Sequence, residues 1–402
     1  TFTGRHSDAA SWLGHALDAD GPADSATRLA AEALRAVNSM ASDGTRDPAE
    51  VEAGMQELRD LGRRLDDVVF PPDSVLTLLR PVVAMFAEDD PRHVDRLVED
   101  GLSSPDPWIA ASLRLFRAAV AENSGDVAGM RSDAEVALEQ FRVIGDRWGM
   151  ASCLGVLAQL KTLDADLDGA IAALEESLAL SEPLAGHDDT MILAIRLADL
   201  RMRTGDIEGA RACIASVQRR ADVSVTSFHS ILIDVALADI ARQEGDLAEA
   251  MRLRDDSLRR LTMLPAAHPA QGHVAAMAHA VSAQLSLEQG DLDDAHAQLV
   301  TALGFAIPTK DMPIVASVGV RAAAFAAADG RPEDAAKMLG AAARLRGAED
   351  PTHPDVVRLT NTLRAALGAD GFAGAYAAGR GLDAEAARLA IAPAPADQAL
   401  LR

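Results

Sequence analysis

One short phrase recurs six times along the chain and limits its fold more than any other feature. Each copy has a turn position, which is Gly in five copies and Ala in one, and five copies follow it with Asp. The turn positions are Gly125, Ala165, Gly205, Gly245, Gly290 and Gly330. They lie 40, 40, 40, 45 and 40 residues apart, which places an insertion of five residues around residues 264–269. A fixed period of this length predicts a solenoid of stacked repeats.

The phrase has the chemistry of a turn between two helices. Gly takes the left-handed backbone conformation that ends one helix, and the following Asp accepts hydrogen bonds from the free amides that begin the next. The residues in this Asp position are Asp126, Asp166, Asp206, Asp246 and Asp291. The sixth turn has Arg331 there instead, but Pro332 after it suits the first turn of a helix. Each unit is therefore predicted to be a helical hairpin.

Small residues recur at fixed distances from each turn and predict how the hairpins stack. Seven residues before the turn position, all six copies have Ala: Ala118, Ala158, Ala198, Ala238, Ala283 and Ala323. Five residues after it, five copies have Ala and the first has Met130. Apolar residues also stand 10 and 14 residues before the turn, which draws one stripe along a helix. The aromatic share is only 3%, so we expect close helix packing through Ala rather than sheets.

This pattern resembles the tetratricopeptide (TPR) repeat family, in which a small residue on the first helix is followed twelve positions later by Ala on the second, with Gly-Asp between them. The likeness covers about residues 106–345, although the period of 40 exceeds the usual 34. HEAT-type repeats have a similar length but lack this Gly-Asp turn, and they stay open as the alternative. The resemblance implies an all-α, right-handed superhelical solenoid of TPR-like helical hairpins with C-terminal capping helices.

The rest of the chain is expected to extend and cap this array. Residues 1–105 are predicted to form irregular N-terminal hairpins, residues 106–345 the six repeats, and residues 346–390 the capping helices, with a turn from Gly368 to Gly371. The segment 391–402 is predicted to be a disordered tail. Since the first residue is Thr rather than Met, we expect the chain to be a fragment of a longer protein.

The C-terminal part carries a second resemblance. The segments 339–346, 363–372 and 377–386 are similar to the closing region of large actinobacterial regulators, the SARP/AfsR-type transcription activators and related STAND-class ATPase regulators. Residues 141–151 resemble the phrase that such regions use between hairpins. Those proteins join a DNA-binding or other effector domain, a nucleotide-binding module and a C-terminal TPR region. The resemblance implies that this chain is the TPR sensor or interaction domain of such a regulator.

Charge and composition exclude several classes of function. The formal net charge of −23 repels phosphate backbones and anionic lipid surfaces, so we expect no direct nucleic-acid or membrane binding. No G-x-x-x-x-G-K-[ST] phosphate loop occurs. No signal-peptide pattern opens the chain, and Cys153 and Cys213 are interpreted as buried reduced thiols. These features together predict a cytoplasmic protein.

No constellation of residues predicts catalysis. His268, His273 and His279 come closest to a cluster, but spacings of 5 and 6 do not place them on one helical face, as metal ligands would require. No G-x-S-x-G elbow occurs, and no carboxylate pair stands out from the acidic surface. We therefore expect no enzyme activity, no metal and no cofactor.

The concave face, lined in TPR arrays by the first helices, is the predicted binding surface. Positions six and two before each turn lie one helical turn apart on that side, and they are polar in the middle repeats. The candidate partner- or effector-binding residues are Gln159, Asp199, Arg203, Asp239, Gln243, Gln284 and Glu288. We expect this strip to be exposed, so that reversing both Asp charges should leave the fold nearly intact. The alternative is that Asp199 and Arg203 form only a solvated surface pair.

The predicted function follows from the fold, the strip and the resemblance. A sensor domain of a transcriptional regulator would bind a protein partner, its own ATPase module or a small effector. A co-chaperone that holds a peptide carboxylate is disfavoured, because Asp199 and Asp239 would oppose it. The alternative is a stand-alone TPR scaffold or adaptor. The two differ in whether the full gene encodes a phosphate loop upstream of Thr1.

Overall fold

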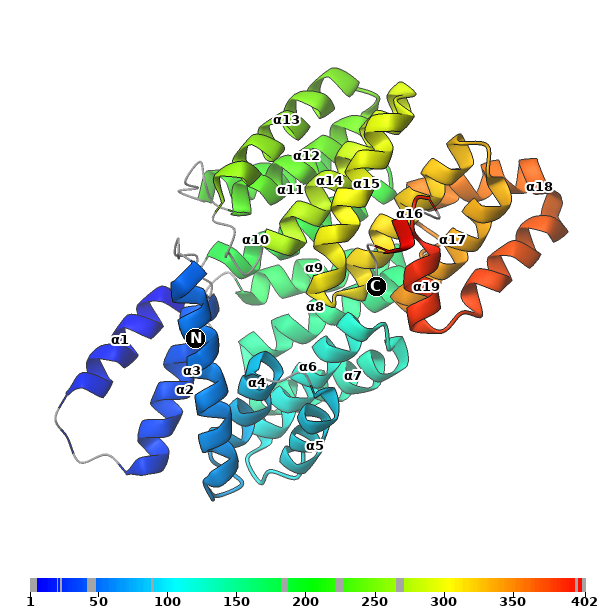
Figure 1. Cartoon of the computed structure of the whole chain (residues 1–402). Coiled ribbons are helices and arrows are strands. Elements are labelled where there is room, and N and C mark those ends of the chain that lie inside the picture. The colour runs from blue at the N-terminus through cyan, green and yellow to red at the C-terminus, as the bar shows by residue number, and fades with distance from the viewer. Residues whose placement is uncertain are drawn as a thin grey trace.

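The computed structural model describes residues 6–19, 21, 24–41, 48–87, 90–181, 187–220, 228–264, 271–394 and 397–399. Within these residues the chain forms α-helices and short 3₁₀ segments, and no strand. Successive helices form hairpins that stack side by side (Figure 1). The predicted fold class is confirmed: an all-α, right-handed solenoid of TPR-like helical hairpins. Most of the five-residue insertion predicted around residues 264–269 lies outside the described residues.

The N-terminal helices precede the regular repeats. They are α1 His6–Asp18, α2 Ser25–Ala41, α3 Pro48–Asp67, α4 Leu76–Ala87 and α5 Pro91–Gly101. Leu29, Leu58 and Leu76 of α2, α3 and α4 are buried in one hydrophobic cluster. A smaller cluster around Leu97 and Leu113 joins α5 to the first repeat.

All six predicted hairpins are present. They pair α6 Pro107–Ser124 with α7 Val127–Ile144, α8 Arg147–Leu163 with α9 Leu167–Ser181, α10 His187–Arg203 with α11 Ile207–Arg220, α12 Phe228–Glu244 with α13 Leu247–Met263, α14 Gln271–Gln289 with α15 Leu292–Ala306, and α16 Met312–Ala328 with α17 Pro332–Arg346. A 3₁₀ turn, η1 Ile307–Thr309, links the last two hairpins.

The turns have the geometry that their sequence predicts. All six turn positions have positive φ, and Ala165 at 62° is the one that is not Gly. In the five copies with Asp, its carboxylate accepts a hydrogen bond of 2.9 to 3.1 Å from the backbone N–H three residues later. Arg331 makes no such cap, and Pro332 begins α17. Local chemistry therefore sets where each helix ends and the next begins.

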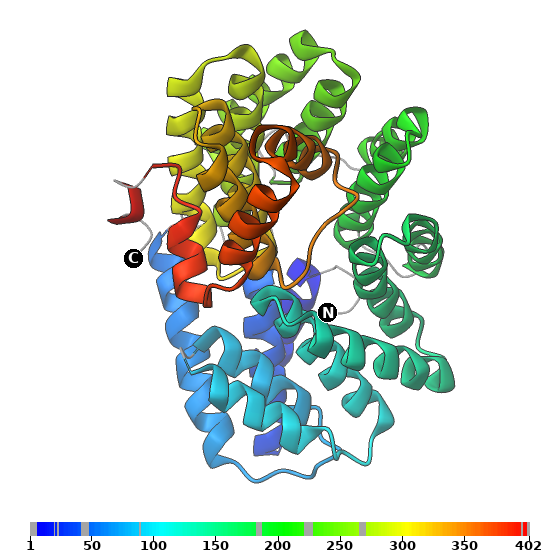
Figure 2. The ribbon, with the colours of Figure 1, turned by 90° about the vertical axis from the view of Figure 1, so that its right-hand side faces the viewer.

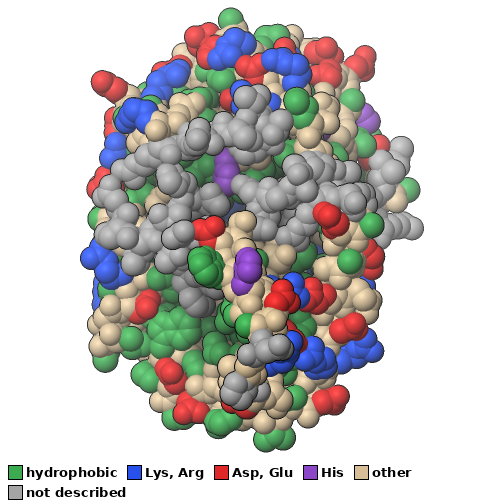
Figure 3. Space-filling view, turned by 90° about the vertical axis from the view of Figure 1, so that its left-hand side faces the viewer, with side chains coloured by type: hydrophobic (Ala, Val, Ile, Leu, Met, Phe, Trp, Pro, Cys, Tyr) green, Lys and Arg blue, Asp and Glu red, His purple; other side chains and the backbone are tan. Residues whose placement is uncertain are grey.

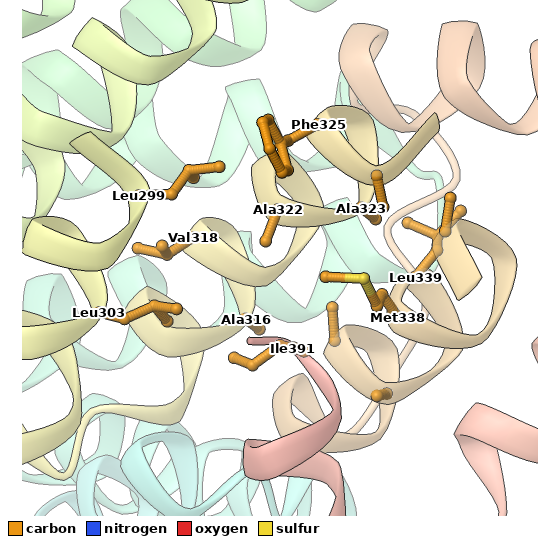
Figure 4. Packing of buried hydrophobic residues seen from close by; sticks show 14 of the residues in the cluster. Leu299, Leu303, Ala316, Val318, Ala322, Ala323, Phe325, Met338, Leu339 and Ile391 are labelled. Carbon is orange, nitrogen blue, oxygen red and sulfur yellow. The ribbon is translucent and has the colours of Figure 1, made fainter. Parts of the chain in front are cut away.

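The small residues pack where the hairpins meet. The six Ala residues before the turns are at most 2% exposed, and their counterparts after the turns are at most 1% exposed. Figure 4 shows the result in the last hairpins, where Leu299 and Leu303 of α15 lie against α16. Met338 of α17 and Ile391 after α19 approach α16 from the other side.

The C-terminal helices cap the last hairpin by close backbone approach. They are α18 Pro354–Arg380, interrupted at Gly368 with φ 73° where a turn was predicted, and α19 Ala384–Ala390. At Gly340 and Gly379 a Cβ atom would overlap carbonyl oxygens of the facing helix. Part of the tail predicted to be disordered also packs, since Ile391 is fully buried and His296 Nε2 lies 2.8 Å from Asp397 Oδ2.

The six hairpins complete a ring rather than an open spiral. Helix α6 of the first hairpin contacts α16 of the last. Figure 2 shows the linker between α17 and α18 passing between the C-terminal helices and the hairpins drawn in green. The ring closes at two glycines in left-handed conformations, where a Cβ on Gly347 would overlap the Gly125 carbonyl and a Cβ on Gly125 would overlap the Leu345 carbonyl.

The stacking Ala positions have no room for a charged side chain. Ala238 is fully buried, so Ala238→Arg is expected to lower the free energy of unfolding by several kcal/mol through overpacking and an unpaired charge. Ala172→Arg, on an exposed position of α9, is the matched control and should change it by less than about 0.5 kcal/mol. Equal melting temperatures for the two variants would contradict the predicted stacking.

The ring closure can be tested by adding one methyl group. Gly205→Ala places a side chain at a positive φ of 84° with open space around it, and should cost about 1 kcal/mol. Gly347→Ala, at φ 85°, adds the overlap with the Gly125 carbonyl, so it should cost more and raise the radius of gyration measured by small-angle scattering. The same loss of stability and the same dimensions in both variants would mean that this contact does not hold the ring closed.

Candidate functional site

The inner side of the ring encloses a chamber. A cavity of about 690 Å³ is lined by the first helices of the hairpins, with Met40 of α2 and Glu122 of α6 at its edge. A smaller cavity of about 260 Å³ shares several lining residues with it, among them Asp199, Arg203 and Arg346. We call the two adjoining cavities the chamber. Its size lies within the range of about 300–1,000 Å³ that ligand pockets occupy.

The chamber is lined by apolar side chains, which we call its apolar end, and by charged side chains nearer the turns, which we call its charged end. Leu232 and Met277 border both cavities, and His273 and Asp311 also border the larger one. Ile192, Leu232 and Met277 stand thirteen residues before their turns and line its apolar part. Nearer the turns, Arg203 and Asp239 line the other part. Because the first helices of the hairpins stack side by side, the same positions in successive repeats meet in space.

The structure divides the predicted strip into two groups. Gln159, Asp199 and Arg203 line the larger cavity, and Asp239 lines the smaller one. Gln243, Gln284 and Glu288 line neither cavity, but each makes a hydrogen bond within the strip. Four of the seven residues therefore border the chamber, and the hydrogen-bond partners of the strip belong to this chain.

Arg242, which the sequence analysis did not select, makes hydrogen bonds to two residues of the strip, Asp239 and Glu288. Its side chain is 1% exposed, and its five N–H donors make five hydrogen bonds. Nε and Nη2 donate to Asp239 at 2.9 and 2.8 Å, Nη1 donates to Glu288 at 2.7 Å, and Nη1 and Nη2 donate to Asp355 at 3.2 and 2.9 Å. Arg358 pairs with Asp355 on its outer side. We call this group the Arg242 cluster.

Arg203 forms a second junction one repeat earlier. Its Nε donates to Asp199 and its Nη1 to Asp350, each at 2.8 Å, and Nη1 also donates to Thr352 at 3.1 Å. Arg346 approaches Asp350 at 3.5 Å. The Arg203 side chain is 6% exposed, so this is not the solvated surface pair of the alternative interpretation.

The segment from Asp350 to Asp355 therefore lies across the predicted binding strip. The segment leads into α18 and includes its first two residues. Asp350 accepts a hydrogen bond from Arg203, and Asp355 accepts one from Arg242. The expectation of a freely exposed strip is wrong, because Asp199 and Asp239 pair with the buried arginines Arg203 and Arg242, although the Asp199 side chain itself is 37% exposed. Reversing the charges of Asp199 and Asp239 would leave Arg203 and Arg242 facing new like charges, which is strongly destabilising at buried sites.

The charges shift the pKa values of the carboxyl groups that they face. Burial alone would raise the pKa of Asp239, but the guanidinium groups of Arg242 and Arg321 outweigh it and hold the pKa at about 2. Burial would also raise the pKa values of Asp350 and Asp355, but neighbouring guanidinium groups outweigh it. Arg203 lowers the pKa of Asp350, and Arg242 lowers the pKa of Asp355. These groups are ionised at neutral pH, and their charges stabilise the junction between the array and α18.

The other candidate side chains have ordinary structural roles. His268 lies outside the described residues, His273 Nε2 is 3.7 Å from Asp311, and His279 Nδ1 is 2.7 Å from Gln298 Oε1. No group of three or more metal-ligating residues occurs in the described part of the chain.

The thiols and the helix lengths answer two further expectations. Cys153 is buried, which raises its thiol pKa to about 12, whereas Cys213 is partly exposed, contrary to the expectation that both are buried. Among the helices that the structure describes, none has the length and apolar run that crossing a bilayer requires.

Several large hydrophobic side chains are exposed on the outer surface among the described residues. The most exposed large hydrophobic side chains are Trp12, Val69, Val143 and Met263, which come from different elements. Figure 3, seen from the side where α1–α3 lie, shows hydrophobic side chains interspersed with acidic and basic ones. Besides the chamber, a second cavity of about 670 Å³ lies between α16, α17 and α18.

Comparison with known proteins reveals a distant likeness. No family model and no curated protein matches the sequence. A STAND ATPase with a TPR sensor from Pyrococcus horikoshii is 10% identical at a TM-score of 0.47, over 89% of this chain and 52% of its own. Yeast Tom70 is 11% identical at 0.46, over 90% and 71%, and the APC/C hetero-tetramer Cut9–Hcn1 is 14% identical at 0.33, over 82% and 62%. This chain thus spans about half the length of the Pyrococcus protein.

The Arg242 cluster predicts an acid dependence of stability. The folded pKa of Asp239, about 2, lies below the ordinary 3.8, so its ionisation stabilises the fold above about pH 4 and this contribution is lost as the pH falls toward 2. A shift of this size corresponds to about 2 kcal/mol. The difference in free energy of unfolding between the wild type and Asp239→Asn should therefore shrink as denaturant titrations move from pH 5 to pH 3. A difference that stays constant over this range would contradict the assigned pairing.

Proposed function

We propose that this chain is the sensor domain of a multidomain transcriptional regulator, and that its chamber binds a small effector. The proposal combines the sequence resemblance to SARP/AfsR-type and STAND-class regulators with the geometry of the ring. Recognition of DNA and hydrolysis of nucleotide belong to other parts of such a protein, which acts in the cytoplasm. This chain contributes the ligand site and passes its occupancy to the upstream ATPase module.

The observation that carries the proposal is the closure of the concave groove. An extended peptide needs a groove that is open along its length, but here α6 meets α16 and the segment 350–355 covers the polar strip. What is left inside the ring is a chamber with apolar walls and a few convergent polar groups. A site of this shape suits a small molecule, which can be surrounded on most sides.

A protein-binding scaffold is the second candidate. On α7, Val136 and Val143 are exposed and stand seven residues apart, so they share one face of the helix. A protein partner could dock there without entering the ring. In that case Val143→Asp would abolish capture of the partner, and a chamber-filling substitution would leave capture unchanged.

A matched pair of substitutions tests the effector site. Met277→Trp fills the apolar end of the chamber, whereas Met263→Trp makes the same change on an exposed position of α13. In a thermal-shift screen of metabolites and nucleotides, at least one compound should raise the melting temperature of the wild type and of Met263→Trp but not of Met277→Trp. Compounds that stabilise all three proteins equally, or no stabilising compound at all, would leave the scaffold as the better description.

A further inference from the structure

The charged end of the chamber has hydrogen-bond donors in excess of acceptors. Arg321 of α16 lines the smaller cavity and is 8% exposed, and its Nη1 donates only to Ser317 on its own helix, at 2.8 Å to the hydroxyl. Its Nε has no acceptor among the described residues, and neither does Nε of Arg346, which lines both cavities. Arg321 is buried and Arg346 partly buried, and each borders the smaller cavity with an Nε donor that has no acceptor in the described part of the chain. Both side chains also border a cavity of about 670 Å³ between α16, α17 and α18.

The acceptors of this region are already engaged. Asp199 and Asp350 accept from Arg203, and Asp239 and Asp355 accept from Arg242. The ring of His353 also lines the smaller cavity, and its Nδ1 accepts from the backbone N–H of Asp355 at 3.2 Å. An unpaired donor on a buried charged group is costly, so the complement that this end lacks is an acceptor, and an anionic one in particular.

The apolar side chains of the chamber restrict the rest of the ligand. Ile192, Leu232 and Met277 line it together with Ile314 and Val318 of α16. These side chains offer dispersion contacts and removal of apolar surface from water, about 25 cal/mol per Å². A ligand that spans both ends therefore needs an apolar body attached to a single acidic head.

We propose that the chamber binds an amphipathic carboxylate, with its head at Arg321 and Arg346 and its apolar body among Ile192, Leu232 and Met277. This inference rests on the proposed function and names its ligand class. A guanidinium group pairs with a planar carboxylate through two parallel N–H donors. A doubly charged phosphate fits less well, because the carboxylates of Asp199 and Asp350 lie within hydrogen-bond reach of the neighbouring Arg203 and repel additional negative charge.

Three probes with the same eight-carbon chain separate the head from the body. Octanoate, octanol and octylamine should be titrated into the whole chain by calorimetry at pH 7. Octanoate should bind at least tenfold more tightly than octanol, and octylamine more weakly than octanol. Arg321→Met should bring the affinity for octanoate to within about threefold of that for octanol, and leave octanol unchanged. Met277→Trp should abolish binding of all three, and Met263→Trp should not.

The outcomes distinguish this inference from the proposed function. Equal affinities, or a preference for octylamine, in the wild type would overturn the assignment of the head, whether or not Arg321→Met folds. Octanoate binding that survives Met277→Trp would place the carboxylate outside the chamber and overturn the inference as well. If none of the probes binds while the metabolite screen yields a compound blocked by Met277→Trp, the ligand class is wrong and the effector site stands. If neither experiment yields a ligand of the chamber, both proposals fail.

Discussion

The guanidinium group of Arg242 connects the middle of the repeat array to its C-terminal cap. It is surrounded by carboxylates of α12, α14 and α18, the last of which is 113 residues away in the sequence. A buried charge of this kind is tolerated only when its donors are paired, and here all five are. The position of α18, the path of the segment 350–355 and the shape of the chamber's charged end all depend on this pairing.

Much of the fold was predictable because its determinants are local and repeated. A Gly followed by Asp sets each turn through its own backbone, and an Ala at a fixed distance allows the next helix to approach. The closure of the ring was not predictable, since it depends on the contact of Gly125 with Gly347. Gly125 was recognised only as a turn residue, and Gly347 belongs to no periodic pattern. The solenoid curvature that brings these residues together is a sum of many small packing angles.

The sequence predicted where the candidate residues Asp199 and Asp239 lie, but not which groups they contact. Counting positions from the turns placed Asp199 and Asp239 correctly on the inner face, because helical periodicity fixes direction. The same counting could not show that Asp350 and Asp355 would lie opposite this face. Nor could it show that Arg242, three residues before its turn, would be buried between Asp239 and Asp355. An ion pair across more than a hundred residues leaves no periodic signal in a single sequence, so the paired strip was interpreted as free surface.

Residues that close the ring also border the chamber. The chamber is lined at once by Glu122 of the first hairpin, by Ser317 and Val318 of the last, and by Arg346 next to the closing glycine. A ligand that touches all of them binds the closed ring better than an opened one, and only such a difference in affinity can shift the balance between two states. Because Arg346 also faces Asp350, occupancy of the chamber and the position of the segment leading into α18 are energetically linked. The cap is therefore coupled to the chamber through the contact of Arg346 with Asp350.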